Sequence, residues 1–477
     1  MSTTMWAKRF APALLVAASA CTTVGPDYAP PGLPAGVATG STGDFEASAS
    51  PAISRAPLPA RWWRLYDDPD LDNLVEQAFA ANTDLRAAAA NLERAQALTR
   101  EVRAASGVQT SLDGSASVGE ASNLGMGHPA GVHDLFSLGG SISYEVDVVG
   151  RIRRAVEAAT ADEQAQAAAL DLARTTVAAA VVGAYTDACA AGASLVVADR
   201  SVALQRQSLE LTERGVRGGL FPPIDATRSR ALLAQLEAAL PGYVAARRLA
   251  LYRLAVLLGQ APQNYPAKLT DCASIPSLDK PIPVGDGAAL IRRRPDIRQA
   301  ERQLATATAR IGVETAALYP TVSLGASAGT TSRTIEGLVS DSALQFSIGP
   351  LISWSFPNRS IARARIDQAS ATARAALAAF DGTLLRALQE AESALTQYSH
   401  DLDENVRLRT ARDRSREAAA MQTRLARGGA VSSLEALDVE RTLAGAEAAL
   451  AASNSKLAAD RVRIFLALGG GWETDAP

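Results

Sequence analysis

Four short segments of the chain alternate strictly between apolar and polar positions. In the first, Leu112 and Val118 fall on one face of an extended chain, and Ser111 and Ser115 fall on the other. A period of two indicates a β-strand whose two faces differ. The pattern predicts strands at about 109–119, 137–147, 320–331 and 345–356. Such strands are typical either of half-buried sheet in a soluble protein or of membrane strands between lipid and water.

Two stretches without proline, residues 151–214 and 363–427, have a composition typical of long helices. Each exceeds 60 residues, which is roughly 100 Å at about 1.5 Å per residue. Glycines after them predict reversals into returning helices at 225–259 and 433–469. A further helix is expected over 70–105. These helices fit either a solvated rod or the wall of a hollow cylinder, and periodicity does not separate the two.

The chain also contains an internal duplication. Arg217-Gly218-Gly219 recurs as Arg427-Gly428-Gly429, and Leu258-Gly259 as Leu468-Gly469, with a constant offset of 210. A register held over Gly, Arg and Leu positions is not a product of the high alanine content. We therefore expect two equivalent halves, each with the order helix, strand, strand, long helix, returning helix.

The composition of the chain excludes some classes of protein. Hydrophobic residues make up 48% of the chain and the net charge is −3, which favours a folded protein and argues against a nucleic-acid binder. No uninterrupted apolar run of about 18 residues follows residue 20, so no transmembrane helix is predicted. If the chain spans a membrane, strands must do so. Four strands do not close a barrel, and open edges in lipid leave backbone groups unpaired, so several copies would share one barrel.

The first residues are typical of a bacterial export signal. Lys8 and Arg9 precede an apolar run over 10–20, which ends in small residues before Cys21. This arrangement resembles a lipoprotein signal, whose Cys is acylated and becomes the mature N-terminus. The alternative is an ordinary cleaved signal with a chance cysteine. Thr22, in place of the Asp that retains lipoproteins at the inner membrane, favours the outer membrane.

Candidate catalytic and metal residues are few. Cys189 and Cys272 match no metal-ligand spacing, and whether they form a disulfide is left open. His128 and His133 with Asp134 could be considered as a metal site, but no further ligand or scaffold completes it. No nucleophile motif or phosphate-binding loop is found. The sequence predicts a protein that is not an enzyme and needs no cofactor or metal.

Several motifs together resemble the TolC-type outer-membrane efflux family, in its NodT-type lipoprotein branch. The motifs are Gly25-Pro26-Asp27-Tyr28, Trp63 to Leu71, Tyr144 to Arg151, and Arg293 to Glu301 continuing to Tyr319-Pro320. The resemblance implies an α+β membrane protein that assembles as a homotrimer, with a 12-strand outer-membrane β-barrel continued by a periplasmic α-helical barrel. The implied function is the exit duct of a tripartite efflux system, working with a periplasmic adaptor (membrane fusion protein) and an inner-membrane RND-type pump. The duct would conduct drugs or other small molecules passively.

The resemblance also assigns segments and site residues. The expected segments are a signal peptide at 1–20, an acylated arm at 21–60, a first repeat at 61–260, an equatorial linker at 261–289, a second repeat at 290–470 and a tail at 471–477. A periplasmic aperture is expected from Glu435 and Asp438, with Asp225 as an acidic partner and Arg217, Arg424 and Arg427 as donors. Two alternatives stay open: the exit duct of a type I protein-secretion system, and a lipid-anchored coiled-coil rod that forms no pore.

Overall fold

The computed structural model describes residues 23–33, 37, 43–46, 50–119, 132–278, 280–356, 359–427 and 433–472. The chain divides into two compact units. The first comprises Met1–Gly32, Asn91–Gln166 and Gln299–Phe380; the second comprises Leu33–Ala90, Ala167–Arg298 and Asp381–Pro477. Each unit takes segments from both halves of the repeat, because the long helices run from one unit into the other.

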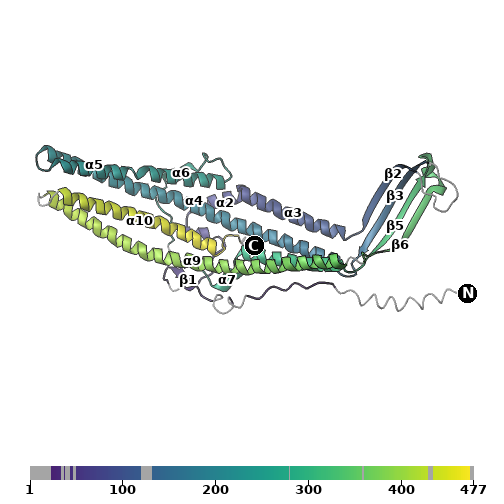
Figure 1. Cartoon of the computed structure of the whole chain (residues 1–477). Coiled ribbons are helices and arrows are strands. Elements are labelled where there is room, and N and C mark those ends of the chain that lie inside the picture. Colours follow the sequence, from purple (N-terminus) through teal and green to yellow (C-terminus); the bar gives the residue numbers. More distant parts are fainter. Residues whose placement is uncertain are drawn as a thin grey trace. The chain divides into compact units, whose positions relative to one another are not determined.

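The first unit holds a four-stranded antiparallel sheet (Figure 1). Its strands are β2 (Gln109–Gly119), β3 (His133–Val146), β5 (Thr321–Ser332) and β6 (Leu344–Ser353), in the order β2-β3-β5-β6. β6 ends three residues earlier than the pattern predicts. Trp354 and Phe356 therefore follow the strand, with ring centroids 5.3 Å apart.

Helices make up the rest of the described chain. The ends of the helices α3 (Thr83–Ala105), α4 (Arg151–Arg217), α8 (Pro295–Ala316) and α9 (Arg359–Arg427) that lie nearer the strands in sequence belong to the first unit. The second unit adds η2 (Trp62–Tyr66), α2 (Pro69–Ala81), α5 (Pro223–Glu237), α6 (Leu240–Leu257), η3 (Ala267–Asp271), α7 (Gly287–Arg293) and α10 (Ser433–Ala467), with a short parallel pair of β1 (Ile53–Ser54) and β4 (Ile282–Pro283). Two short helices, η4 (Glu336–Val339) and η5 (Asp341–Ala343), join β5 to β6.

The core of the second unit is built around one aromatic stack. Trp62 stacks on Phe465 with ring centroids 4.4 Å apart, and both are fully buried. Leu71, Leu254 and Leu395 are also inaccessible to solvent. At about 25 cal/mol per Å² of apolar surface, this burial is the main stabilising contribution to the packed helices.

Two helices expected to be continuous are broken. The helix expected over 70–105 divides at Asn82, whose Oδ1 accepts hydrogen bonds from the backbone N–H groups of Asp84 (2.9 Å) and Leu85 (3.1 Å) and so starts α3 as a cap. The return expected over 225–259 divides at residues 238–239, just before Pro241. A proline removes one helical N–H and crowds the preceding turn, which explains the second break.

The prediction about membrane helices needs one correction. Among the described residues, α4 is long and apolar enough to cross a membrane by length and composition alone. Its apolar window is 56% buried within the protein. A core helix meets the same criteria, so this property alone does not make α4 a membrane span.

Candidate functional site

The two faces of the sheet have opposite character. Ser111 pairs with Ser141 in the β2–β3 ladder, Ser141 with Ser327, and Ser327 with Ser347, so one row of serines crosses all four strands. The Oγ atoms of the first and last pairs are each 2.9 Å apart. The other face is apolar and exposed to solvent in the single chain; it includes Leu112, Val118, Leu138, Ile142, Leu324, Phe346, Ile348 and Ile352. An apolar surface of this extent marks contact with lipid or protein.

A glycine-dependent turn joins α4 to α5. Gly219 has a positive φ of 75°, which residues with a β-carbon rarely adopt. Gly215 lies so close to Phe221 that an added β-carbon would be 2.2 Å from the aromatic ring. α5 then begins at Pro223, at a position where a helix needs no N–H donor.

On this hairpin, Arg217 and Asp225 each have an ion-pair partner on their own helix. Arg217 Nη1 is 4.0 Å from Glu213 Oε2, and its side chain is 67% exposed. Asp225 is buried in the first turn of α5, 3.9 Å from Arg228 Nη1. Glu213 also accepts from Arg230 Nη2 at 2.6 Å. The Glu213–Arg230 pair, which sequence reasoning missed, therefore connects α4 to α5.

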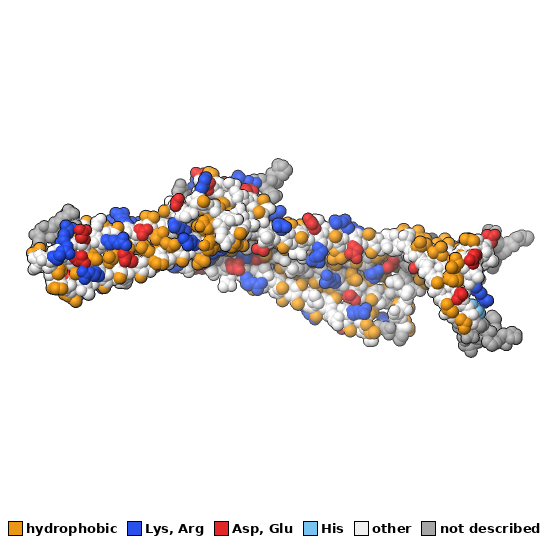
Figure 2. Space-filling model, turned by 90° about the horizontal axis from the view of Figure 1, so that it is seen from above, with side chains coloured by type: hydrophobic (Ala, Val, Ile, Leu, Met, Phe, Trp, Pro, Cys, Tyr) orange, Lys and Arg blue, Asp and Glu red, His pale blue; other side chains and the backbone are white. Residues whose placement is uncertain are grey.

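On the second hairpin, Glu435 and Asp438 are exposed at the start of α10. Arg441 Nη2 donates to Asp438 Oδ1 at 2.7 Å, a pair one turn apart on the same helix. Figure 2 shows acidic and basic side chains intermingled over this end of the α4–α5 and α9–α10 hairpins. Neither acidic nor basic side chains predominate at this end of the hairpins.

The predicted donors of α9 lie at its C-terminal end. Arg424 Nε donates to the Ala420 carbonyl at 3.3 Å, within its own helix. Arg427 is the last residue of α9. The predicted Gly turn at 428–429 lies outside the described residues, as do Cys21 and His128.

Ion pairs at equivalent positions tie each long helix to its return. Arg206 Nη2 lies 2.6 Å from Glu237 Oε1, and Arg416 Nη2 lies 2.7 Å from Glu447 Oε1. The two pairs are related by the offset of 210, so the internal duplication is the sequence signal that predicts them. A further bond joins the two halves, since Ser208 Oγ donates to Glu440 Oε2 at 2.8 Å. Burial raises the pKa of Glu440.

Within each half, the junction between the end of the returning helix and the residue that precedes α3 or α8 also repeats, with different residues. Asn82 Nδ2 donates to the Leu257 carbonyl at 3.0 Å, and Arg294 Nη1 donates to the Ala467 carbonyl at 2.8 Å. Arg294 is 7% exposed and also binds Asp296 at 2.7 Å and Glu390 at 2.8 Å. Each bond satisfies a carbonyl that the helix end leaves free.

The N-terminal motif is held in the first unit by a buried arginine. Arg154 Nη2 lies 2.6 Å from Asp27 Oδ1, and Arg154 Nε donates to the Val24 carbonyl at 3.1 Å. Tyr28 donates its hydroxyl to Glu301, which also binds Arg302. Two motifs far apart in the sequence are thus one contact surface in the fold.

The structure contains a disulfide that the spacing of the cysteines could not predict. Cys189 on α4 is bonded to Cys272, which follows η3. Beside it, Gly192 leaves room for the backbone, because an added β-carbon would lie 1.9 Å from the Cys272 carbonyl oxygen. The linker segment is therefore fastened closely to α4.

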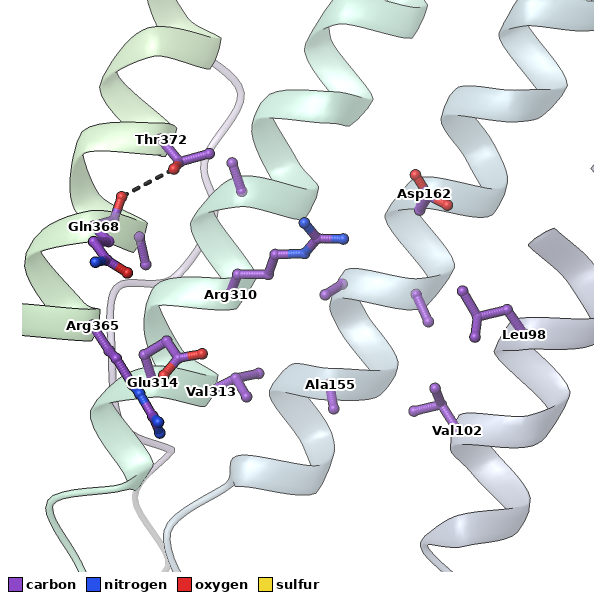
Figure 3. A pocket seen from close by; sticks show the side chains of 14 residues that line it. Leu98, Val102, Ala155, Asp162, Arg310, Val313, Glu314, Arg365, Gln368 and Thr372 are labelled. Carbon is purple, nitrogen blue, oxygen red and sulfur yellow. Dashed lines mark hydrogen bonds between the residues drawn. The ribbon is translucent and has the colours of Figure 1, made fainter. Parts of the chain in front are cut away.

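One groove of about 580 Å³ lies among the helices of the first unit (Figure 3). Its floor is formed by small and apolar side chains that include Leu98, Val102 and Val313. Charged side chains, Arg310 and Arg365 among them, line the same groove. Asp162 and Glu314 line the groove as well. None of the described residues forms a cluster of three or more His, Cys, Asp or Glu placed to hold a metal ion.

Comparison with known proteins identifies the class. Residues 74–260 and 288–470 match the family described as outer membrane efflux protein, so the chain belongs to this family. The two matched ranges correspond to the two halves of the repeat. The family is a transport family and not an enzyme family.

Individual relatives show which members of the family the chain is similar to. It is 29% identical to nodulation protein T of Rhizobium leguminosarum bv. viciae over 97% of this chain and 94% of that protein. It is 30% identical to the solvent efflux pump outer membrane protein SrpC of Pseudomonas putida, over 94% and 95%. The solved outer-membrane channel OprN superposes with a TM-score of 0.88 at 35% identity, over 94% of this chain and 99% of OprN. The protein is an outer-membrane efflux channel that extends into the periplasm.

Proposed function

We propose that the protein works as a homotrimer in which each copy supplies four strands to one 12-strand barrel. The observation that carries this proposal is the sheet itself, with an exposed apolar face, a serine face, and edge strands β2 and β6 that pair with nothing else among the described residues. Unpaired edges are costly in lipid, and joining β2 of one copy to β6 of the next removes them. Lipid would contact the apolar face and water the serines.

In this assembly the helical hairpins form a periplasmic tunnel. A periplasmic adaptor and an inner-membrane RND-type pump would deliver drugs or other small molecules to it, and the channel would conduct them passively. Relatives named for solvent efflux and pyoverdine export support small-molecule cargo over the secretion of proteins. The coiled-coil rod is disfavoured by the match to a channel family.

Two further parts of the proposal concern single residues. Cys21 is acylated and anchors the mature N-terminus in the outer membrane. Replacing Cys21 with Ser should abolish labelling by radioactive palmitate, and continued labelling would contradict the anchor. Glu435 and Asp438 form a ring of carboxylates at the closed periplasmic aperture, supported by their exposure at the start of α10. Rings of carboxylates favour cations.

The assembly is tested by cross-linking together with conductance. The purified protein carrying Leu112→Cys on β2 and Ile348→Cys on β6 is treated with a bifunctional thiol reagent. We expect a covalent trimer and small, cation-selective single-channel currents. Ile142→Cys with Ala326→Cys, which face each other within one chain, is the control and should cross-link without raising the mass. A monomeric product from the edge pair with no conductance would overturn the proposal.

A further inference from the structure

Two acidic side chains meet inside the α9–α10 hairpin. Asp401 on α9 is 3% exposed and Asp460 on α10 is 2% exposed. Asp401 binds Lys456, which lies one turn before Asp460 on α10, so the two carboxyl groups lie at the same level of the hairpin. The Oδ2 atom of each is buried and has no hydrogen-bond donor among the described residues. Carboxylate oxygens accept but do not donate, so one added proton would let the two Oδ2 atoms satisfy each other.

The remaining oxygens of the pair are already occupied. Asp401 Oδ1 accepts from Lys456 Nζ at 2.7 Å and from Gln397 Nε2 at 2.8 Å. Asp460 Oδ1 accepts from Arg463 Nη1 at 3.0 Å. Glu404 on α9 is the other nearby acid, 3.7 Å from Lys456 Nζ. Each carboxyl group thus has one ion-pair partner at its Oδ1 atom, and the two Oδ2 atoms are left without a hydrogen-bond donor.

We propose that Asp401 and Asp460 share one proton and that its loss loosens the packing of α10 on α9, which makes this hairpin a proton-sensitive part of the channel. With the proton present, the pair is an interhelical hydrogen bond. Without it, two negative charges face each other in a poorly solvated interior, where repulsion is strong. The link to channel opening rests on the proposed function; the sharing of the proton does not.

The direction of the pH effect follows from the two groups. Burial, then the hydrogen bond and charge of Asp401, raise the pKa of Asp460 to about 6. Burial alone would raise the pKa of Asp401, but hydrogen bonds from Lys456 and Gln397 lower it. Between pH 4 and 6 the folded hairpin thus holds a proton that an unfolded Asp460 would release. The hairpin is most stable with this proton and loses that stability as the pH rises through about 6.

The first half provides an internal comparison. At the positions 210 residues earlier, alanines replace both acids, namely Ala191 on α4 and Ala250 on α6. Neither alanine titrates, so the effect should be confined to the second hairpin.

Hydrogen exchange of the full-length protein in detergent tests the proposal. Protection of peptides over 395–409 and 453–467, corrected for intrinsic rates, should fall by at least about tenfold from pH 4.5 to 7.5, because the proton is lost over the range between the pKa values of the unfolded and the folded Asp460. Peptides over 185–199 and 243–257 should change little. Asp460→Asn, which keeps a neutral hydrogen-bonding group, should abolish the pH dependence. Asp199→Asn, at an exposed site on α4, is the matched control and should behave like the unmodified protein.

A second variant keeps the test decisive if Asp460→Asn does not fold. The double variant Asp401→Ala with Asp460→Ala copies the first half and should also remove the pH dependence. Equal protection of the unmodified protein at both pH values would overturn the proposal. So would a pH dependence of the same size in both variants. Because exchange is read without any current, a channel that fails to conduct would count against the proposed function alone.

Discussion

The two halves of the chain build the same hairpin around different interiors. Both use an Arg–Glu pair to join the long helix to its return, and in both the residue that precedes α3 or α8 donates to a carbonyl at the end of the return. The second half alone, however, places a carboxyl pair between its helices, and the first half alone has a disulfide and a broken return. The repeat therefore preserves the contacts that set helix positions, while the interior between helices has diverged. Four sets of substitutions test this difference between the halves.

The largest effect is expected at the junction. Arg294→Ala should lower the free energy of unfolding by about 3–5 kcal/mol, because it leaves Asp296, Glu390 and the Ala467 carbonyl without their buried donor. Asn82→Ala, at the equivalent position, should cost about 1–2 kcal/mol, because it removes a cap and one neutral hydrogen bond. Unfolding in denaturant, followed by circular dichroism, measures both. Equal losses would show that the two junctions are energetically alike.

The disulfide comes next. Replacing Cys189 and Cys272 with Ala should cost about 2–4 kcal/mol, since the bond closes a long loop in the unfolded chain. A reductant should lower the melting temperature of the unmodified protein and leave that of the double variant unchanged. A reductant effect that persists in the variant would mean that this bond is not its source.

The repeated ion pairs should differ in strength. Glu447 is 9% exposed at its side chain and Glu237 is 40% exposed. Glu447→Gln should therefore cost about 1–3 kcal/mol, because Arg416 loses a partner that is largely shielded from water. Glu237→Gln should cost about 0–1 kcal/mol, the usual value for an exposed pair. Raising the salt concentration should weaken the Glu237 pair more, and a reversed order would contradict the role of burial.

The smallest effect on stability is expected at the aperture. Glu435→Gln with Asp438→Asn should leave unfolding nearly unchanged, because both side chains are exposed. Single-channel recordings should nevertheless show reduced cation preference. Glu210→Gln, which removes an exposed charge near the end of the first hairpin, is the control. Unchanged selectivity in the double variant would exclude these two residues from the aperture.

The sequence predicted those features that follow from spacing. A period of two located the strands and assigned their faces, because a strand has only two sides. The offset of 210 located the halves, and a motif resemblance identified the family.

Features that depend on three-dimensional contact escaped prediction. The spacing of Asp401 and Asp460 on two different helices is typical of solvated helix charges, and only the fold reveals their burial. The Glu213–Arg230 pair spans a turn whose closure depends on how Phe221 packs. At Asn82 the cap of α3 is local, but the additional bond to the distant Leu257 carbonyl is encoded by no local pattern.

The contact between the N-terminal motif and α4 means that the proposed lipid anchor would fix how deeply the channel sits in the membrane. Val24 N donates to the Val149 carbonyl at 2.9 Å, just before α4 begins. Three peptide units separate Cys21 from Val24, a reach of at most about 11 Å. If Cys21 is acylated as proposed, the acyl chain would hold the inner surface of the bilayer level with the start of α4, where β3 has just ended at Val146. So short a link would prevent the channel from moving along the membrane normal when a partner protein binds the far ends of its helices.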